Sequence, residues 1–202
     1  MPLWLADQPL VLASKSAVRR AVLESAGIPL DVHPADIDER DIETRAGTAT
    51  PGEIAALLAR EKATAVSAGE PGRLVLGADQ TLALGERMFT KPADVRAARE
   101  QLRTLRGRTH ELHAAIAVIR DGVVLFEHRG IARLTMRAFS DGFLDAYLAA
   151  AGGVVTASVG AYQVENLGIH LFERIEGDHF TILGLPLLAL LDFLQRNGWV
   201  AA

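Results

Sequence analysis

The chain has 202 residues, of which 50% are hydrophobic and 23% are charged, and it contains no cysteine. A chain of this length can bury a substantial core, and the lack of cysteine excludes a disulfide framework and a thiolate metal site. The formal net charge of -4 argues against a general nucleic-acid-binding protein, which needs a basic face. The N-terminal segment lacks the basic flank and apolar core of a signal peptide, and no apolar run has membrane-spanning length, so we expect a cytoplasmic protein without membrane partners.

Strands and helices alternate in the first part of the chain. Ser14 and Ser16 lead into a helix that Gly27 can end, and Thr50 and Glu53 have the spacing of a capping box for the next helix. The expected elements are a strand over residues 10–13, a helix over 17–26, a strand over 28–34, an acidic loop over 35–43 and a helix over 50–69.

Antiparallel strands are predicted for the middle of the chain. Gly85 and the pair Asp121-Gly122 mark two turns, and the second is a strong hairpin signal. In order, we expect a strand over 73–79, a hairpin over 81–89, a helix from about 94 to 107 and a second hairpin over 109–139. A helix over 142–151, a strand over 168–176 and a final helix over 184–198 should follow. No repeat or linker divides the chain, so we predict one α/β domain over residues 1–202 with a mixed sheet.

Two arginines occupy the first turn of the first helix, where the helix dipole favours anions over cations. Local stability therefore does not explain Arg19 and Arg20. One interpretation is a phosphate site made of Ser14, Ser16, backbone amides and at least one arginine. The alternative is that both arginines are solvated or paired with the acidic loop, and the spacing leaves both open.

Lys62 occupies a helix position that should face the core, because it shares a stripe with Ile54, Leu58 and Val66 at steps of four. Such a lysine either extends to solvent at the helix end or points into a cleft toward phosphate, and pairing with Asp79 also fits.

Asp79 directly follows an apolar strand, and open α/β sheets bind ligands beyond the carboxyl ends of their strands. This position favours a metal ligand or a general base. The alternative role, a helix or turn cap, is weaker because apolar strand sequence continues after Asp79.

Asp36, Asp38 and Glu39 form a compact acidic group that could supply oxygen ligands to magnesium, or could be a solvated surface. His110 and His113 are three apart in a predicted strand and should face opposite sides, so we do not predict them as metal ligands.

Lys91 lies just before a helix, where a cation again gains nothing from the dipole. With Arg19 and Lys62 it makes three cations at element ends, and Glu39 and Asp79 add two carboxylates. This set is typical of a phosphoryl-transfer site.

Several motifs follow one another along nearly the whole chain, namely LVLASKSAVRRAVLESAG, AREKA, LVLGADQTLALGERMFTKPAD, SVGAYQVENLG and ERIEGDHFTILGLPLLALL. In this order they resemble the Maf, or septum-formation inhibitor, family of nucleoside triphosphate pyrophosphatases. The resemblance implies a two-lobed Maf/ITPase-like α/β fold, with a twisted mixed β-sheet flanked by helices and a deep central cleft. It also implies a homodimer that hydrolyses non-standard or pyrimidine triphosphates with a divalent cation, magnesium or manganese.

The resemblance assigns roles to the charged residues. The phosphate-binding serine and arginine correspond to Ser14 and Arg19, the loop glutamate to Glu39, the two lysines to Lys62 and Lys91, and the general base to Asp79. Asp79 would activate water for attack on the α-phosphorus, and the cation held by Asp79 and Glu39 would offset the negative charge.

Three further positions distinguish the branches of the family by substrate base. Gln80 and Glu165 resemble the branch that acts on 7-methyl-GTP, in which a carboxylate could accept hydrogen bonds from a guanine edge. Val18 departs from this branch, which usually has tryptophan there, a natural partner for a positively charged base.

Two other classes of function were weighed. A nucleotide-binding regulator of cell division that cleaves slowly or not at all stays an alternative, because Ser16-Ala17-Val18-Arg19 differs from the usual Ser-Pro-Arg-Arg. A dinucleotide-dependent oxidoreductase is disfavoured, because the first strand leads into Ser-Lys-Ser without a glycine-rich turn for a pyrophosphate.

Overall fold

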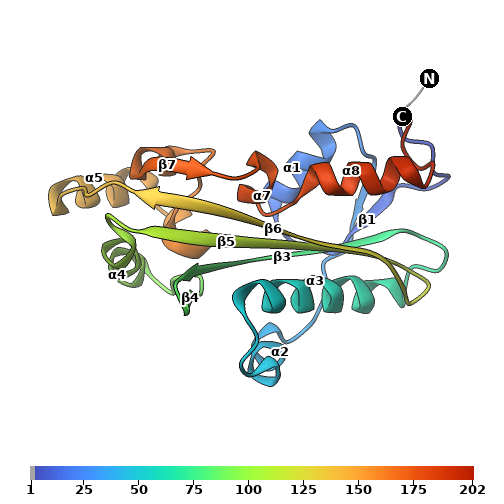
Figure 1. Ribbon diagram of the computed structural model, residues 1–202, viewed down its shortest axis with the longest axis horizontal. Coiled ribbons are helices and arrows are strands. Elements are labelled where there is room, and N and C mark those ends of the chain that lie inside the picture. The colour runs from blue at the N-terminus through green and yellow to red at the C-terminus, as the bar shows by residue number, and fades with distance from the viewer. Residues whose placement is uncertain (1–2) are drawn as a thin grey trace.

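A long, twisted mixed sheet forms the centre of the molecule, as the computed structural model of residues 3–202 shows (Figure 1). The strands are β1 (Leu10–Leu12), β2 (Leu30–Val32), β3 (Val75–Leu84), β4 (Arg87–Phe89), β5 (Thr109–Arg120), β6 (Val123–Met136) and β7 (Phe172–Glu176). The helices are α1 (Ala17–Ser25), α2 (Glu39–Ala46), α3 (Pro51–Ser67), α4 (Val95–Leu105), α5 (Asp141–Ala151), α6 (Val154–Ala157), α7 (His179–Ile182) and α8 (Leu187–Arg196), with 3-10 turns η1 (Val159–Ala161) and η2 (Leu167–Leu171). The expected α/β class with a mixed sheet is confirmed.

The strand order is β2-β1-β3-β5-β6-β7, and β4 also pairs with β3. β1 runs parallel to β2 and β3, whereas the other pairs are antiparallel. Because β5 occupies one edge of β3, both β1 and β4 lie on the other edge. There β1 pairs with Val75 and Leu76, and β4 pairs from Leu82 onward. Residues 78–81 therefore have no strand partner on this edge, and we call this stretch the β3 gap.

Helix α3 covers one face of the sheet and lies very close to it (Figure 1). Its sheet-facing residues are Ala55, Ala59 and Ala63, and a Cβ at Gly77 of β3 would lie 2.0 Å from the carbonyl oxygen of Ala59. The small side chains and the glycine permit this approach. Lys62 lies between Ala59 and Ala63 in the sequence of α3, so the same close approach brings it near β3 around Gly77.

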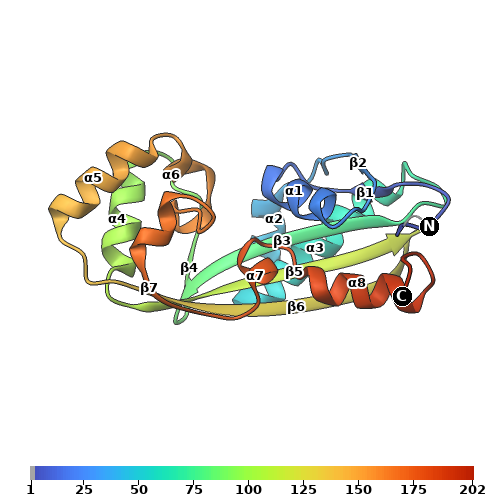
Figure 2. The same cartoon turned by 90° about the horizontal axis from the view of Figure 1, so that it is seen from above.

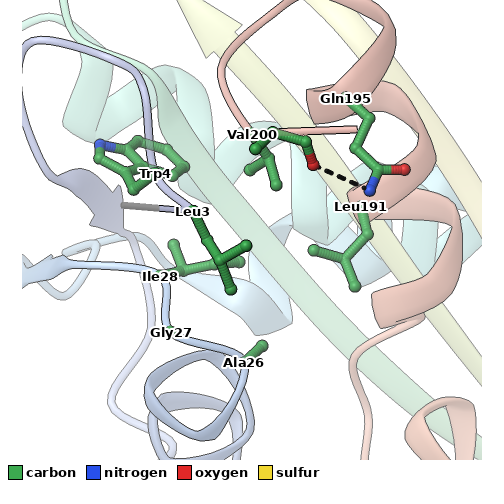
Figure 3. Close-up of a pocket in the computed structure, with 9 residues that line it drawn as sticks. Leu3, Trp4, Ala26, Gly27, Ile28, Leu191, Gln195 and Val200 are labelled. Carbon is green, nitrogen blue, oxygen red and sulfur yellow. Dashed lines mark hydrogen bonds between the residues drawn. The ribbon is translucent and has the colours of Figure 1, made fainter. Parts of the chain in front are cut away.

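The opposite face carries two groups of helices at the two ends of the long strands (Figure 2). At one end α1 and α8 pack on β1, β3 and β5, and at the other end α4, α5 and η1 pack on β3, β5 and β6. A pocket of about 150 Å³ opens between the N-terminal segment and α8, where Leu3, Ile28 and Leu191 are among its lining residues (Figure 3). This apolar pocket adds nothing to the predicted site.

Three local predictions were wrong. The segments 73–79 and 81–84 form one continuous strand, so Asp79 lies in the middle of β3 and not at a strand end. Part of the acidic loop is helix α2, which Asp38 caps by accepting a hydrogen bond from the Asp41 amide at 3.0 Å. Of the predicted strand over 168–176, only Phe172–Glu176 is strand, because residues 167–171 form a 3-10 turn.

The turn and cap predictions were confirmed. Thr50 and Glu53 form the reciprocal capping box of α3, and Gly27 adopts a positive φ of 72° after α1. Across residues 3–202, every helix is too short or too polar to cross a bilayer.

Candidate active site

Lys62 lies between two carboxylates at the β3 gap. Its Nζ atom is 2.5 Å from Asp79 Oδ1 and 2.8 Å from Glu39 Oε1. Lys62 and Asp79 are 9% and 8% exposed, so this charge pair is almost fully buried, whereas Glu39 is exposed. A buried lysine and a buried aspartate each need such a partner, because an isolated charge in the interior is very unfavourable. Of the options that the sequence left open for Lys62, the structure shows the pairing with Asp79.

The alternation of β3 decides which way Asp79 points. Asp79 and Thr81 point to the same face as Gly77, the face toward α3. There Thr81 Oγ1 donates to the carbonyl oxygen of Pro51 at 2.9 Å. Because the strand edge beside Asp79 is the β3 gap, no neighbouring strand covers it there. Asp79 thus lies in the middle of β3, past the residues of β3 that pair with β1, and not at a strand end as predicted.

Arg19 hydrogen-bonds to the backbone of β3 at the β3 gap, where no neighbouring strand does so. Its Nη1 atom donates to the carbonyl oxygen of Ala78 at 2.7 Å and to Ser14 Oγ at 3.2 Å, and its Nε atom donates to the carbonyl oxygen of Gly184 at 2.9 Å. Burial lowers the pKa of the guanidinium, and the charges of Asp79 and Glu39 oppose that shift. Of the two interpretations of Arg19, the structure excludes the solvated one and places its guanidinium beside Ser14, which is 7% exposed. Arg20 instead pairs with Glu24 at the surface.

Glu43 is a carboxylate at this site that the sequence reasoning did not single out. It lies one turn after Glu39 on α2 and is partly buried. Burial raises its pKa most, followed by the nearby charges of Asp79 and Glu39. The spacing of four between Glu39 and Glu43 would have placed them on one helix face, had this segment been predicted as helix.

The remaining predicted residues do not touch the Lys62 cluster directly. Lys91 is exposed in the segment after β4, Glu165 is exposed in a turn between η1 and η2, and Val18 is partly buried on α1. Gln80 faces the opposite side of β3 from Asp79, where its Nε2 atom donates to the carbonyl oxygens of Thr181 and Ile182 at 3.0 and 3.1 Å. Their roles in phosphate and base recognition stay predictions.

The two histidines lie on opposite faces of β5, as predicted. His110 is fully buried and hydrogen-bonded to the Tyr162 hydroxyl at 2.6 Å, whereas His113 pairs with Glu111 at 3.1 Å. Within residues 3–202, no cluster of three or more carboxylates or histidines is arranged as a preformed metal cage. Asp79 and Glu39 nevertheless suit magnesium or manganese chemically, because such ions bind through one or two carboxylates and complete their shell with water and substrate phosphates.

Three relatives match this chain over almost its whole length. Two proteins named nucleoside triphosphate pyrophosphatase, from two strains of Rhodopseudomonas palustris, are 61% and 64% identical and cover 100% of both chains. A protein of Mesorhizobium japonicum named 7-methyl-GTP pyrophosphatase is 51% identical over 95% of this chain and 97% of its own. A solved structure of a HAM1 protein from Coxiella burnetii is 17% identical, with a TM-score of 0.41 over 65% of this chain and 74% of that one, which is too distant to bear on function.

The protein-family comparison agrees with the resemblance that the sequence motifs indicate. The family model described as Maf-like protein matches residues 9–197. This range includes β1, Arg19, the ion pair of Lys62 and Asp79, and α7. The chain therefore belongs to the Maf-like protein family.

Proposed function

We propose that this chain is a nucleoside triphosphate pyrophosphatase, which adds water to the α-phosphorus and releases a monophosphate and pyrophosphate. The observation that carries this proposal is the buried Lys62 between Asp79 and Glu39, beside Arg19 and Ser14 at the β3 gap. The names of full-length relatives at 61% and 64% identity support the same activity.

The residues divide into two functional groups. Asp79 accepts a proton from the attacking water, because it is the buried carboxylate that opens on the β3 gap. Arg19, Lys62 and Lys91 bind the phosphates, and Ser14 keeps Arg19 in place. Asp79 and Glu39 would hold a magnesium or manganese ion, which would supply positive charge to offset the negative charge of the phosphates.

The Lys62 ammonium occupies the space between the two proposed metal ligands. Binding of a divalent cation there requires Lys62 to leave at least one of the carboxylates. Lys62 would then be available to the phosphates of the same substrate. The lysine thus offsets part of the negative charge of the two carboxylates before substrate binds.

The substrate base that fits best is guanine, and 7-methyl-GTP is the first candidate. The relative from Mesorhizobium japonicum carries that name at 51% identity. Exposed Glu165 is the carboxylate proposed to face the base, and partly buried Val18 on α1 is proposed to lie beside it. We further propose that the enzyme acts as a homodimer in the cytoplasm, on free nucleotides and without nucleic-acid or membrane partners.

Pyrophosphate release from 7-methyl-GTP, GTP, UTP, dTTP and CTP, with magnesium or manganese, tests the proposal. Asp79→Asn keeps the shape of the side chain and removes its charge, so we expect turnover to fall about a thousandfold. Near-normal turnover in this variant would remove Asp79 from the mechanism. Tight nucleotide binding without release in the wild type would instead favour the regulator of cell division.

A further inference from the structure

Strand β6 has an edge that no other strand covers. On one side it pairs with β5 along its length, and on the other side β7 pairs only with residues 133–136. The chain leaves β7 just beyond them, because a Cβ at Gly177 would lie 3.2 Å from the carbonyl oxygen of Ile131. Within residues 3–202, the stretch 123–130 therefore has no strand beside it, and we call it the β6 edge (Figure 2).

The backbone of the β6 edge has hydrogen-bonding groups that point away from the sheet. The amide of Met136 donates to the segment just before β5 at 3.0 Å, and the amide of Arg137 donates to the end of η2, on the β7 side, at 2.8 Å. This direction alternates along an antiparallel strand, so even-numbered residues of β6 bond to β5 and odd-numbered residues point outward. Glu127 and Arg129 thus direct their amide and carbonyl groups away from β5.

Helices cover both faces of β6 but leave this edge open. On one face, Glu127 accepts hydrogen bonds from Arg60 Nε and Nη2 of α3 at 2.6 and 2.8 Å. On the other face, the ring of Phe126 stacks on α8. The three residues at the middle of the edge, Glu127, His128 and Arg129, are nevertheless exposed. A strand edge with free amides and carbonyls can pair with a strand of another chain.

We propose that the β6 edge pairs antiparallel with the β6 edge of a second copy of this chain, with His128 of the two copies opposite each other at a two-fold axis. This register puts Glu127 opposite Arg129 of the second copy, and does so twice. The outward backbone groups of these two residues then form hydrogen bonds between the copies, and the two sheets become one. The inference rests on the homodimer in the proposed function and does not depend on the proposed activity.

Charge favours this register over its neighbours. A two-fold axis perpendicular to the sheet keeps opposite side chains on one face, so the axis has to pass through a residue. An axis at Glu127 would place two glutamates opposite each other, and an axis at Arg129 would place two arginines there, and both arrangements are destabilising. An axis at His128 gives two pairs of opposite charge. Arg60 already holds the Glu127 carboxylate, so less side-chain freedom is lost on pairing.

The same register also covers apolar surface at the end of the hairpin. Val123 and Val124 are 60% and 42% exposed. In the paired edges they lie toward the end of β7 in the second copy, because residues 133–136 there are the ones that β7 covers. Burial of these side chains adds to the hydrogen bonds and the charge pairs.

A single cysteine tests the register directly, because the chain has none. The two His128 residues form a non-hydrogen-bonded pair, whose Cα atoms are about 4.5 Å apart, and a disulfide spans about 4.4–6.8 Å. His128→Cys should therefore oxidise to a covalent dimer. Val123→Cys is the control and should cross-link much less, because the two copies of this residue lie at opposite ends of the paired edges. Equal cross-linking of the two variants, or none in His128→Cys, would overturn the proposal.

A charge exchange tests the two ion pairs. Arg129→Glu makes both pairs like-charged, so the dissociation constant of the dimer should rise about tenfold or more, and Glu127→Arg should act in the same way. An equimolar mixture of the two variants restores opposite charges and should form a heterodimer. Analytical ultracentrifugation over a concentration series measures this, and Arg96→Glu, at an exposed position of α4, is the control for the charge change. Wild-type affinity in both single variants would place the dimer interface elsewhere.

These measurements do not depend on nucleotide hydrolysis. An inactive wild type that dimerises, together with a covalent dimer of His128→Cys, would reject the proposed activity and keep the β6 interface. A wild type that stays monomeric at every concentration would overturn the interface and the homodimer, whatever its pyrophosphate release.

Discussion

Two buried ionisable side chains of this molecule, Lys62 and His110, are stabilised in opposite ways, one as a charged group and one as a neutral group. At the β3 gap, Lys62 is charged and is stabilised by the charges of Asp79 and Glu39. At the far end of the sheet, His110 is hydrogen-bonded to Tyr162, and burial lowers its pKa to about 4, so the ring is neutral at pH 7. The neutral pair belongs to a hydrophobic cluster, whereas the charged group lies where β3 lacks a neighbouring strand.

The difference indicates which group serves function and which serves the fold. Burial of a neutral hydrogen-bonded pair in a core has a small free-energy cost, so such a pair needs no ligand to stabilise it. A buried charge cluster is less favourable than an apolar packing of similar volume, so its presence at an open strand edge points to a ligand. Substitutions at the two places should therefore separate activity from stability.

After Asp79→Asn, the largest effect is expected for Lys62→Met. The loss of its charge at the phosphates should lower kcat/KM about a hundredfold or more. It also leaves two close carboxylates without a cation, so manganese should raise the melting temperature of the variant more than that of the wild type. Lys62→Arg is the control, since it keeps the charge and should show the smaller, wild-type response to manganese. Equal manganese responses in all three proteins would mean that Lys62 and the metal do not compete.

His110 should make the stability of the protein depend on pH. Because its folded pKa is depressed to about 4 from 6.5, the unfolded chain binds the proton more readily. The stability that the neutral ring contributes is fully present above pH 6.5 and is lost as the pH falls to about 4, roughly 3 kcal/mol in total. Urea unfolding at several pH values measures this slope. His110→Phe should reduce it, and an unchanged slope would assign it to other groups.

Tyr162→Phe should be milder and should leave the chemistry intact. It removes the hydroxyl that satisfies His110 Nε2, and His110 Nδ1 already has no polar partner among residues 3–202. We expect the free energy of unfolding to fall by about 1–3 kcal/mol, with kcat/KM unchanged at temperatures where the variant is folded. Tyr147→Phe removes a hydroxyl that donates to a backbone carbonyl in the same cluster and is the matched control for a lost hydroxyl. A large loss of kcat/KM in folded Tyr162→Phe would place this end of the sheet in the site.

Local signals in the sequence predicted the caps and turns, because these depend on neighbouring residues. The capping box of Thr50 and Glu53 and the turn at Asp121-Gly122 are examples, and both are found in the structure. The sequence also indicated that Lys62, a lysine on a core-facing stripe, needs a partner, and pairing with Asp79 was one of the options that it left open. The family resemblance covered the chain more completely than these physical signals did.

The missed features depend on contacts between distant parts of the chain. Asp79 opens on the site because β1 ends early and β4 pairs further along, which the sequence of β3 alone does not indicate. The hydrogen-bond partners of Gln80 lie 101 and 102 residues away, so these contacts could not be predicted from its position after Asp79. Helix α2 was missed because it has only Ile42 as a buried apolar residue and so has no clear periodicity.

The smallest effect is expected for Glu43→Gln, which tests how far the charged region extends along α2. Glu43 is partly buried and lies close enough to Asp79 and Glu39 for their charges to raise its pKa, after the larger effect of burial. Removal of its negative charge should weaken the attraction of the site for a divalent cation, so the metal concentration for half-maximal activity should rise about two- to tenfold while kcat at saturating metal stays near the wild-type value. Glu86→Gln, in the exposed turn between β3 and β4, is the matched control and should leave the metal dependence unchanged. The same metal dependence in Glu43→Gln and the wild type would limit the metal-binding region to Asp79 and Glu39, whereas a loss of kcat at saturating metal would place Glu43 among the groups that act on the substrate.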